Sequence, residues 1–88
     1  MSDATYRPIT GEALHQRHRR ALVLIANGCT NAGIAEAMQV SENTAEFYVK
    51  QILARLGAHD RAHAVALALR HGCIGLADVT AHPELPAA

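Results

Sequence analysis

Apolar residues recur at helical spacing in two neighbouring segments, 31–38 and 42–56. The apolar positions are Ile34, Ala35 and Met38 in the first segment and Ala45, Val49, Ile52, Leu53 and Leu56 in the second. Residues three and four apart share one side of an α-helix, so each segment predicts a helix with one buried face. Gln39 and Val40 form the turn between them. A short helix, a tight turn and a longer helix with a polar outer side are typical of small domains that present a helix to DNA.

The ends of these helices carry capping residues. Thr30 precedes the first helix, and Ser41 stands where the N-cap of the second belongs, its hydroxyl free to accept an early backbone N–H. Gly57 follows the second helix as a left-handed C′ residue.

Two further helices are expected on either side of this pair. The first runs from about 12 to 27, with one stripe formed by Leu14, His18, Ala21, Leu22 and Ile25. Thr10 is a plausible cap for it, and Glu12 in its first turn favours the helix dipole. The other helix covers residues 61–71, between Asp60 as its cap and Gly72.

The predicted fold is therefore all-α, a four-helix domain over residues 11–73 with flexible termini. Residues 1–10 are expected to form a flexible N-terminal arm, because they contain a proline and small polar residues. Residues 74–88 are expected to form a flexible tail, because they hold two prolines and show no periodicity.

Composition narrows the function classes. The chain has 88 residues, of which 50% are apolar and 3% aromatic, which suits one small helical domain. No run of about 18 apolar residues is present, and the N-terminus lacks a signal pattern, so we expect a cytoplasmic protein without a membrane partner. The two cysteines are expected to be reduced. No nucleophile–base pair, glycine-rich phosphate loop or carboxylate pair is visible, so neither an enzyme nor a cofactor is expected.

The charge is balanced overall but not along the chain. The formal net charge is zero, yet residues 15–70 hold seven Lys or Arg against four Asp or Glu, which leaves +3. Non-specific DNA affinity scales with the number of phosphates neutralised, so DNA binding should be modest or should depend on dimerisation.

The outer side of the helix over 42–56 supplies most of the candidate DNA-binding residues. With the start of the helix over 31–38, the full set is Thr30, Asn31, Asn43, Thr44, Glu46, Phe47, Lys50 and Gln51. Thr30 and Asn31 could offer backbone N–H groups to a phosphate. Thr44 suits a phosphate contact or a local backbone bond better than base reading.

Three of these residues each allow more than one interpretation. Phe47 could touch thymine methyls, anchor a protein partner, or be an incidental exposed aromatic. Lys50 could contact a phosphate or a guanine edge, or be a plain solvated lysine. Glu46 is repelled by phosphates, although on a base edge it can accept from cytosine N4.

The helix over 61–71 is apolar over more of its circumference than one packing partner needs. It could sit deep among the other helices, but in so small a domain we favour a two-fold homodimer interface. The expected interface residues are Ala62, Val65 and Leu69.

Histidines and arginines raise two further possibilities. His15 with His18, or His59 with His63, have spacings that could share a zinc ion, but no paired cysteine motif accompanies them, so no metal is expected. The cluster at 17–20 holds three arginines that could touch the DNA backbone, although a solvated helix face is the simpler interpretation.

From Leu14 to Gly72 the chain resembles the C-terminal helix-turn-helix of LuxR/GerE-type transcription regulators. The matching positions are Leu22, Leu24, Ala26, Gly28, Thr30, Asn31, Ile34, Ala35, Val40, Ser41, Thr44, Val49, Ile52, Leu53, Leu56, Gly57, Arg61 and Ala64. The resemblance implies a four-helix domain whose third helix enters the major groove and whose fourth often dimerises. Most such domains follow a receiver or ligand-binding domain; none is seen in this chain, which is thus expected to resemble the stand-alone members.

The chain departs from the family pattern where charge matters. A Leu-Thr-x-Arg-Glu run is replaced by residues 14–18, so that His18 stands in place of an acid. A Lys-Glu pair becomes Ala32 and Gly33, and the Lys of a Thr-Val-Lys run becomes Glu46. The leading hypothesis is a dimeric, sequence-specific DNA-binding transcription regulator with double-stranded DNA as its partner. The alternative is a helix-turn-helix scaffold that binds a protein and has weak or no DNA affinity.

Overall fold

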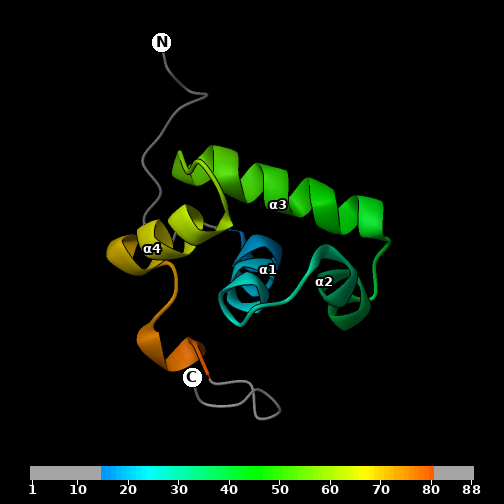
Figure 1. Ribbon diagram of the computed structural model, residues 1–88, viewed down its shortest axis with the longest axis horizontal. Helices are drawn as coiled ribbons and strands as arrows, with labels where there is room; N and C mark the ends of the chain where they lie inside the picture. Colours follow the sequence, from blue (N-terminus) through cyan, green and yellow to red (C-terminus); the bar gives the residue numbers. More distant parts are fainter. Residues whose placement is uncertain (1–14, 81–88) are drawn as a thin grey trace.

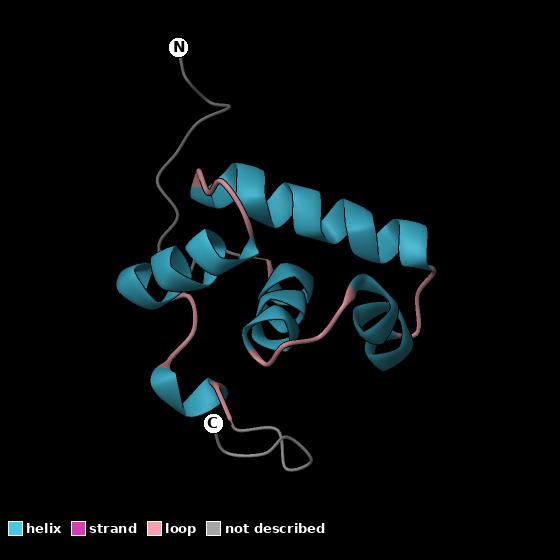
Figure 2. Cartoon of the chain, in the orientation of Figure 1, coloured by secondary structure: helices cyan, strands magenta, loops and turns pink. Residues whose placement is uncertain are grey.

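The structure is a computed structural model that describes residues 15–80. It contains α1 (Gln16–Ala26), α2 (Asn31–Met38), α3 (Glu42–Leu56), α4 (Arg61–His71) and a short 3-10 helix, η2 (Leu76–Asp78). All regular elements of the described part are helices joined by loops (Figure 2). The longest, α3, lies across α1 and α2, and α4 packs near the end of α3 (Figure 1). The predicted all-α, four-helix fold is confirmed.

Local chemistry explains where the helices begin and end. Thr30 accepts the Gly33 N–H at 3.1 Å, and Ser41 accepts the Thr44 N–H at 3.0 Å. The Asp60 carboxylate accepts the His63 N–H at 2.8 Å at the start of α4. These bonds satisfy N–H groups that have no partner inside the helix. The bounds predicted for α2, α3 and α4 agree with the structure.

Helices α2, α3 and α4 end in left-handed residues. Gly57 and Gly72 have φ of 69° and 76°, which glycine adopts without a Cβ clash. Gln39, in the turn between α2 and α3, has φ of 59° and is the one non-glycine residue with positive φ between residues 15 and 80. Two carbonyls of α2 accept its backbone N–H, which closes the turn tightly.

The start of α1 differs from the prediction. A helix from about residue 12 was expected, but α1 begins at Gln16, and the ψ of His15 is 144°. His15 acts as the cap, because its Nδ1 accepts the Arg17 N–H at 3.2 Å. The proposed cap Thr10 and the first-turn Glu12 lie outside the described residues.

The packed region extends past its predicted end at residue 73. Cys73 and Ile74 are only 2% and 3% exposed and belong to the core. Burial raises the pKa of the Cys73 thiol, although the nearby Arg19 charge opposes the shift. Ile74 therefore packs in the core, one position beyond the predicted end of the domain.

Residues 75–80, which we call the strap, are held against α1 by side-chain hydrogen bonds. Arg19 donates from Nε to the Cys73 carbonyl at 3.1 Å and lies 3.3 Å from an Asp78 carboxylate oxygen. Asn27 donates to the Asp78 carbonyl at 2.8 Å and accepts the Thr80 N–H at 2.7 Å. Residues 75–80 are thus bonded to α1 although they fall in the segment predicted as a flexible tail, and residues 81–88 of that segment lie outside the described part.

Candidate nucleic-acid interface

The two sides of α3 have opposite environments. The inner side consists of Ala45, Val49, Ile52 and Leu56, which are 0–9% exposed. These residues join α1, α2 and α4 in one core. The outer side consists of Asn43, Phe47, Lys50 and Ala54, all of which are exposed, as is the neighbouring Glu46. The structure therefore leaves the predicted outer side of α3 exposed within the described part of the protein.

Phe47 has 56% of its surface exposed, one of few large apolar side chains of the described part that lie so open. Its neighbours on the outer side, Asn43 and Lys50, are polar and exposed. An aromatic ring held on a rigid helix can make apolar contact with a partner, and a thymine methyl is one such group.

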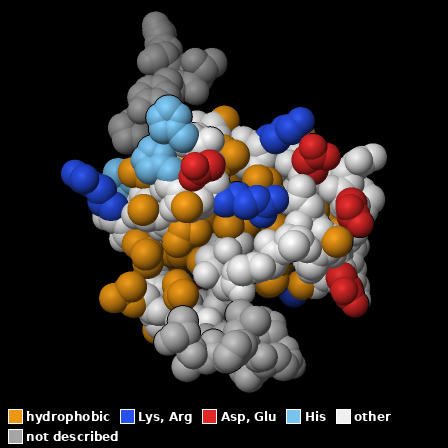
Figure 3. Space-filling model, viewed as in Figure 1, with side chains coloured by type: hydrophobic (Ala, Val, Ile, Leu, Met, Phe, Trp, Pro, Cys, Tyr) orange, Lys and Arg blue, Asp and Glu red, His pale blue; other side chains and the backbone are white. Residues whose placement is uncertain are grey.

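Glu46 and Lys50 lie one helical turn apart and form an ion pair at 4.0 Å. Figure 3 shows basic and acidic side chains side by side over α3. An exposed i,i+4 pair stabilises a helix by only about 0.3–0.5 kcal/mol. Its larger effect is electrostatic, because Glu46 lowers the positive potential that Lys50 offers to a phosphate.

Gln51 and Thr44 were predicted on the DNA-binding side but are half-buried at its edge. The Gln51 Oε1 lies 2.8 Å from His18 Nε2, which joins α3 to α1. The His18 ring also meets Tyr48 edge-on, with the ring centroids 5.7 Å apart. The Thr44 hydroxyl accepts from the Ser41 hydroxyl at 3.0 Å, a bond between two side chains and not the local backbone bond considered from the sequence.

The start of α2 is tied to α4. The Asn31 side-chain oxygen accepts from the Arg61 guanidinium, and both residues line a shallow hollow with Thr30 and Glu42. Arg61 Nη1 is buried without a hydrogen-bond partner in the described part. The role of Arg61 was not predicted from periodicity, because the two residues that it joins are 30 positions apart.

The predicted interface residues of α4 fall into two groups. Ala62 is exposed, whereas Val65 and Leu69 are half-buried against the core. Ala64 and Ala68 are completely buried. Apolar side chains gather over α4 and the nearby C-terminal segment in Figure 3.

The residues considered for metal binding do not form a larger cluster. His59 and His63 stack at 5.4 Å, and His63 Nδ1 accepts the His59 N–H. Within residues 15–80, no group of three or more His, Cys, Asp or Glu side chains is placed to hold a metal ion. No helix of this part is both long and apolar enough to cross a membrane.

This arrangement agrees with comparisons with known proteins. Residues 12–68 match the model of a family described as bacterial regulatory proteins, luxR family. The chain belongs to this family. The family is one of regulators and not an enzyme class.

Relatives of this LuxR-family chain include two named regulators. It is 43% identical over 56 residues to the Hyphomicrobium methylovorum protein named "Probable transcriptional regulatory protein SgaR", covering 64% of the chain and 26% of that protein. It is 38% identical over 63 residues to the response regulator VraR of Staphylococcus aureus, covering 72% of the chain and 30% of VraR. The chain thus spans less than a third of the length of these relatives.

Two solved structures are similar to this chain in fold. VqmA bound to DPO superimposes with a TM-score of 0.63 at 30% identity, covering 68% of the chain and 30% of VqmA. A Vibrio cholera VqmA–ligand–DNA complex gives a TM-score of 0.62 at 26% identity, covering 81% of the chain and 30% of that protein.

Proposed function

We propose that this LuxR-family domain regulates transcription by binding double-stranded DNA sequence-specifically, as a homodimer with α3 in the major groove of each half-site. The observation that carries the proposal is the exposed outer side of α3 on a helix whose inner side is fully packed. An α-helix fits the major groove, and only exposed side chains can reach base edges there. Family membership and a DNA-bound structural neighbour support it.

The structure suggests different tasks for the candidate residues. Asn43, Glu46, Phe47 and Lys50 are exposed and can face base edges or nearby phosphates. Thr30 and Asn31 begin α2, where free backbone N–H groups suit a phosphate. Thr44 stands near the start of α3 and suits a phosphate, whereas Gln51 must give up its bond to His18 to reach DNA.

A salt titration with Lys50→Ala tests DNA binding. Duplexes that the chain retains from a genomic fragment library supply a specific site, and a mixed-sequence duplex supplies the non-specific reference. If Lys50 neutralises a phosphate, the variant binds more weakly, and the slope of log affinity against log salt falls by about 1.8, because each protomer of the dimer loses one contact of about 0.9. Arg70→Ala is the matched control, because Arg70 is an exposed cation on α4. A parent chain that binds no duplex in dilute buffer would refute the proposal.

A test of the homodimer through α4 requires a variant that leaves the packing of the core intact. Leu69 and Val65 pack partly against the core, so a charge there would also unfold the domain. Ala62 is exposed in the first turn of α4, where a glutamate is compatible with the helix dipole. We expect Ala62→Glu to convert a dimer into a folded monomer in light scattering. A variant that keeps the parent mass would exclude Ala62 from the interface.

The alternative is a protein-binding module that uses the same side of α3, favoured by the exposed Phe47 and by the acid at position 46. Glu46→Lys separates the two functions. Under the DNA proposal it removes the partner of Lys50 and adds a cation, so duplex affinity rises and the salt slope steepens. If the outer side of α3 instead binds a protein through Glu46, the Glu46→Lys variant still has negligible duplex affinity, and its complex with the protein partner is disrupted.

A further inference from the structure

The three arginines of α1 have different surroundings. Arg19 donates to the Cys73 carbonyl and pairs with Asp78 of the strap. Arg20 donates to the Ala37 carbonyl at 3.4 Å, at the end of α2. Arg17 is exposed, and its guanidinium has no hydrogen-bond or ion-pair partner among residues 15–80. Of the three, Arg17 is the one available to an external ligand.

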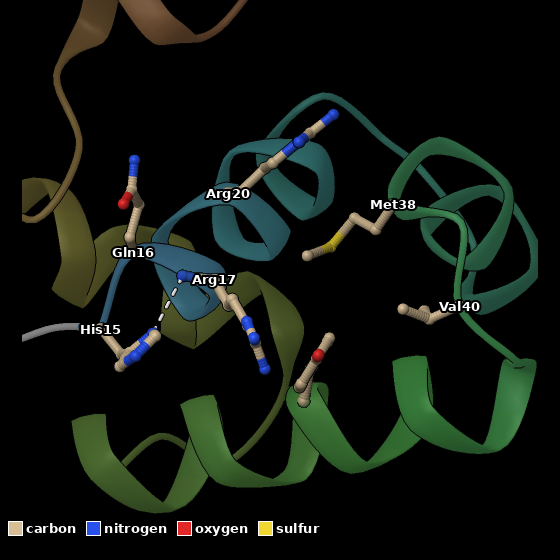
Figure 4. Close-up of a pocket in the computed structure, with 7 residues that line it drawn as sticks. His15, Gln16, Arg17, Arg20, Met38 and Val40 are labelled. Atoms are coloured by element: carbon tan, nitrogen blue, oxygen red, sulfur yellow. Dashed lines mark hydrogen bonds between the residues drawn. The ribbon is translucent and has the colours of Figure 1, made fainter.

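Arg17 lines a groove of about 680 Å³ between the start of α1, the end of α2 and one side of α3. Figure 4 shows its side chain reaching toward α3, while Arg20 points the opposite way. Met38 and Val40 extend into the groove. No carboxylate is among the described residues that line this groove, in contrast to the outer side of α3, where Glu46 pairs with Lys50.

The groove lies on one flank of α3, and the start of α2 lies on the other. Tyr48 lines the groove and contacts His18 of α1. On the opposite flank, Glu42 of α3 shares a hollow with Thr30 and Asn31. A helix inserted into a major groove about 12 Å wide has a phosphate backbone on each flank.

We infer that Arg17 contacts a phosphate of the DNA strand opposite the strand met by the start of α2. The inference rests on the proposed function and adds a second backbone contact to it. A guanidinium can hold a phosphate with two parallel N–H···O bonds, which fixes the register of the helix in the groove. The contact also adds positive charge to the DNA-facing surface, and this compensates for the positive charge of the outer side that Glu46 reduces.

The test measures duplex affinity of the full chain between about 50 and 200 mM salt, with the library-selected and mixed-sequence duplexes. Arg17→Ala should weaken binding to both duplexes to a similar extent, roughly three- to tenfold for each protomer, and reduce the salt slope of the dimer by about 1.8, or about 0.9 for each protomer. Arg17→Lys should keep most of the slope, because a lysine still neutralises a phosphate. Arg70→Ala again serves as the control, and thermal melting checks that each variant folds.

Two results would overturn the inference. One is an Arg17→Ala slope equal to that of the parent while Lys50→Ala reduces it. The other is a loss of affinity confined to the selected duplex, since that would mark Arg17 as a base reader. A parent chain that binds neither duplex refutes the proposed function itself and is recognised before any variant is compared.

Discussion

The inner and outer sides of α3 lie on one helix but are constrained by different forces. On the inner side, Ala45 and Ile52 have no exposed surface, and α3 as a whole contacts α1, α2 and α4. On the outer side, Phe47 is 56% exposed and is not a member of the core cluster. Core packing therefore restricts the inner residues by volume and shape, whereas the outer residues are restricted only by what binds there.

This difference explains how the chain can depart from the family pattern without losing the fold. Glu46 stands where the resemblance implies a cation, yet α3 extends unbroken from Glu42 to Leu56. A charge change on the exposed side costs the fold little, because water solvates either charge. The same change alters the electrostatic potential offered to DNA.

The largest expected contrast is in stability. Ile52→Ala should lower the free energy of unfolding by about 2–5 kcal/mol, because it leaves a cavity among fully buried neighbours. Urea titrations followed by circular dichroism measure the change. Phe47→Ala is the matched control on the outer side and should stay within about 0.5 kcal/mol of the parent. Equal losses in the two variants would mean that the outer side is covered in solution.

Gln51 sharpens the boundary between the two sides. Its bond to His18 Nε2 is part-buried, and His18 Nδ1 is already without a partner in the described part. Gln51→Ala should therefore cost about 1–2 kcal/mol of unfolding free energy. If Gln51 contacts only His18 and not DNA, the duplex affinity of the Gln51→Ala variant should differ from that of the parent by less than about twofold. A drop in affinity comparable with that of Lys50→Ala, at unchanged stability, would return Gln51 to the DNA-contacting set.

Local signals accounted for most of the fold. Periodicity located α2, α3 and α4, and the capping residues Thr30, Ser41 and Asp60 set their starts. Each of these signals acts within about four residues, so a sequence displays it directly. The same helical periodicity that predicted the core residues of α3 also predicted that Phe47 and Lys50 are exposed.

The contacts that were missed join distant parts of the chain. Asn27 binds the strap across 51 positions, and Arg19 reaches Asp78 across 59. His18 meets Gln51 across 33. No local pattern encodes such pairs, so the strap was predicted as part of a flexible tail and Gln51 as a DNA-binding side chain.

The smallest expected effect concerns Gly33, in the helix that positions α3. Glycine in a helix interior costs about 1 kcal/mol relative to alanine, because it loses more backbone entropy on folding. A Cβ added at Gly33 would lie 3.5 Å from Cys29 Cβ and 3.6 Å from Thr30 Oγ1, which are ordinary van der Waals distances. Gly33→Ala should therefore raise the unfolding free energy by about 0.5–1 kcal/mol in urea titrations. Duplex affinity should not change, since Gly33 adds no charge and lies in α2, away from the outer side of α3. A stabilised variant with altered affinity would show that the flexibility of α2, and not only the outer side of α3, controls binding.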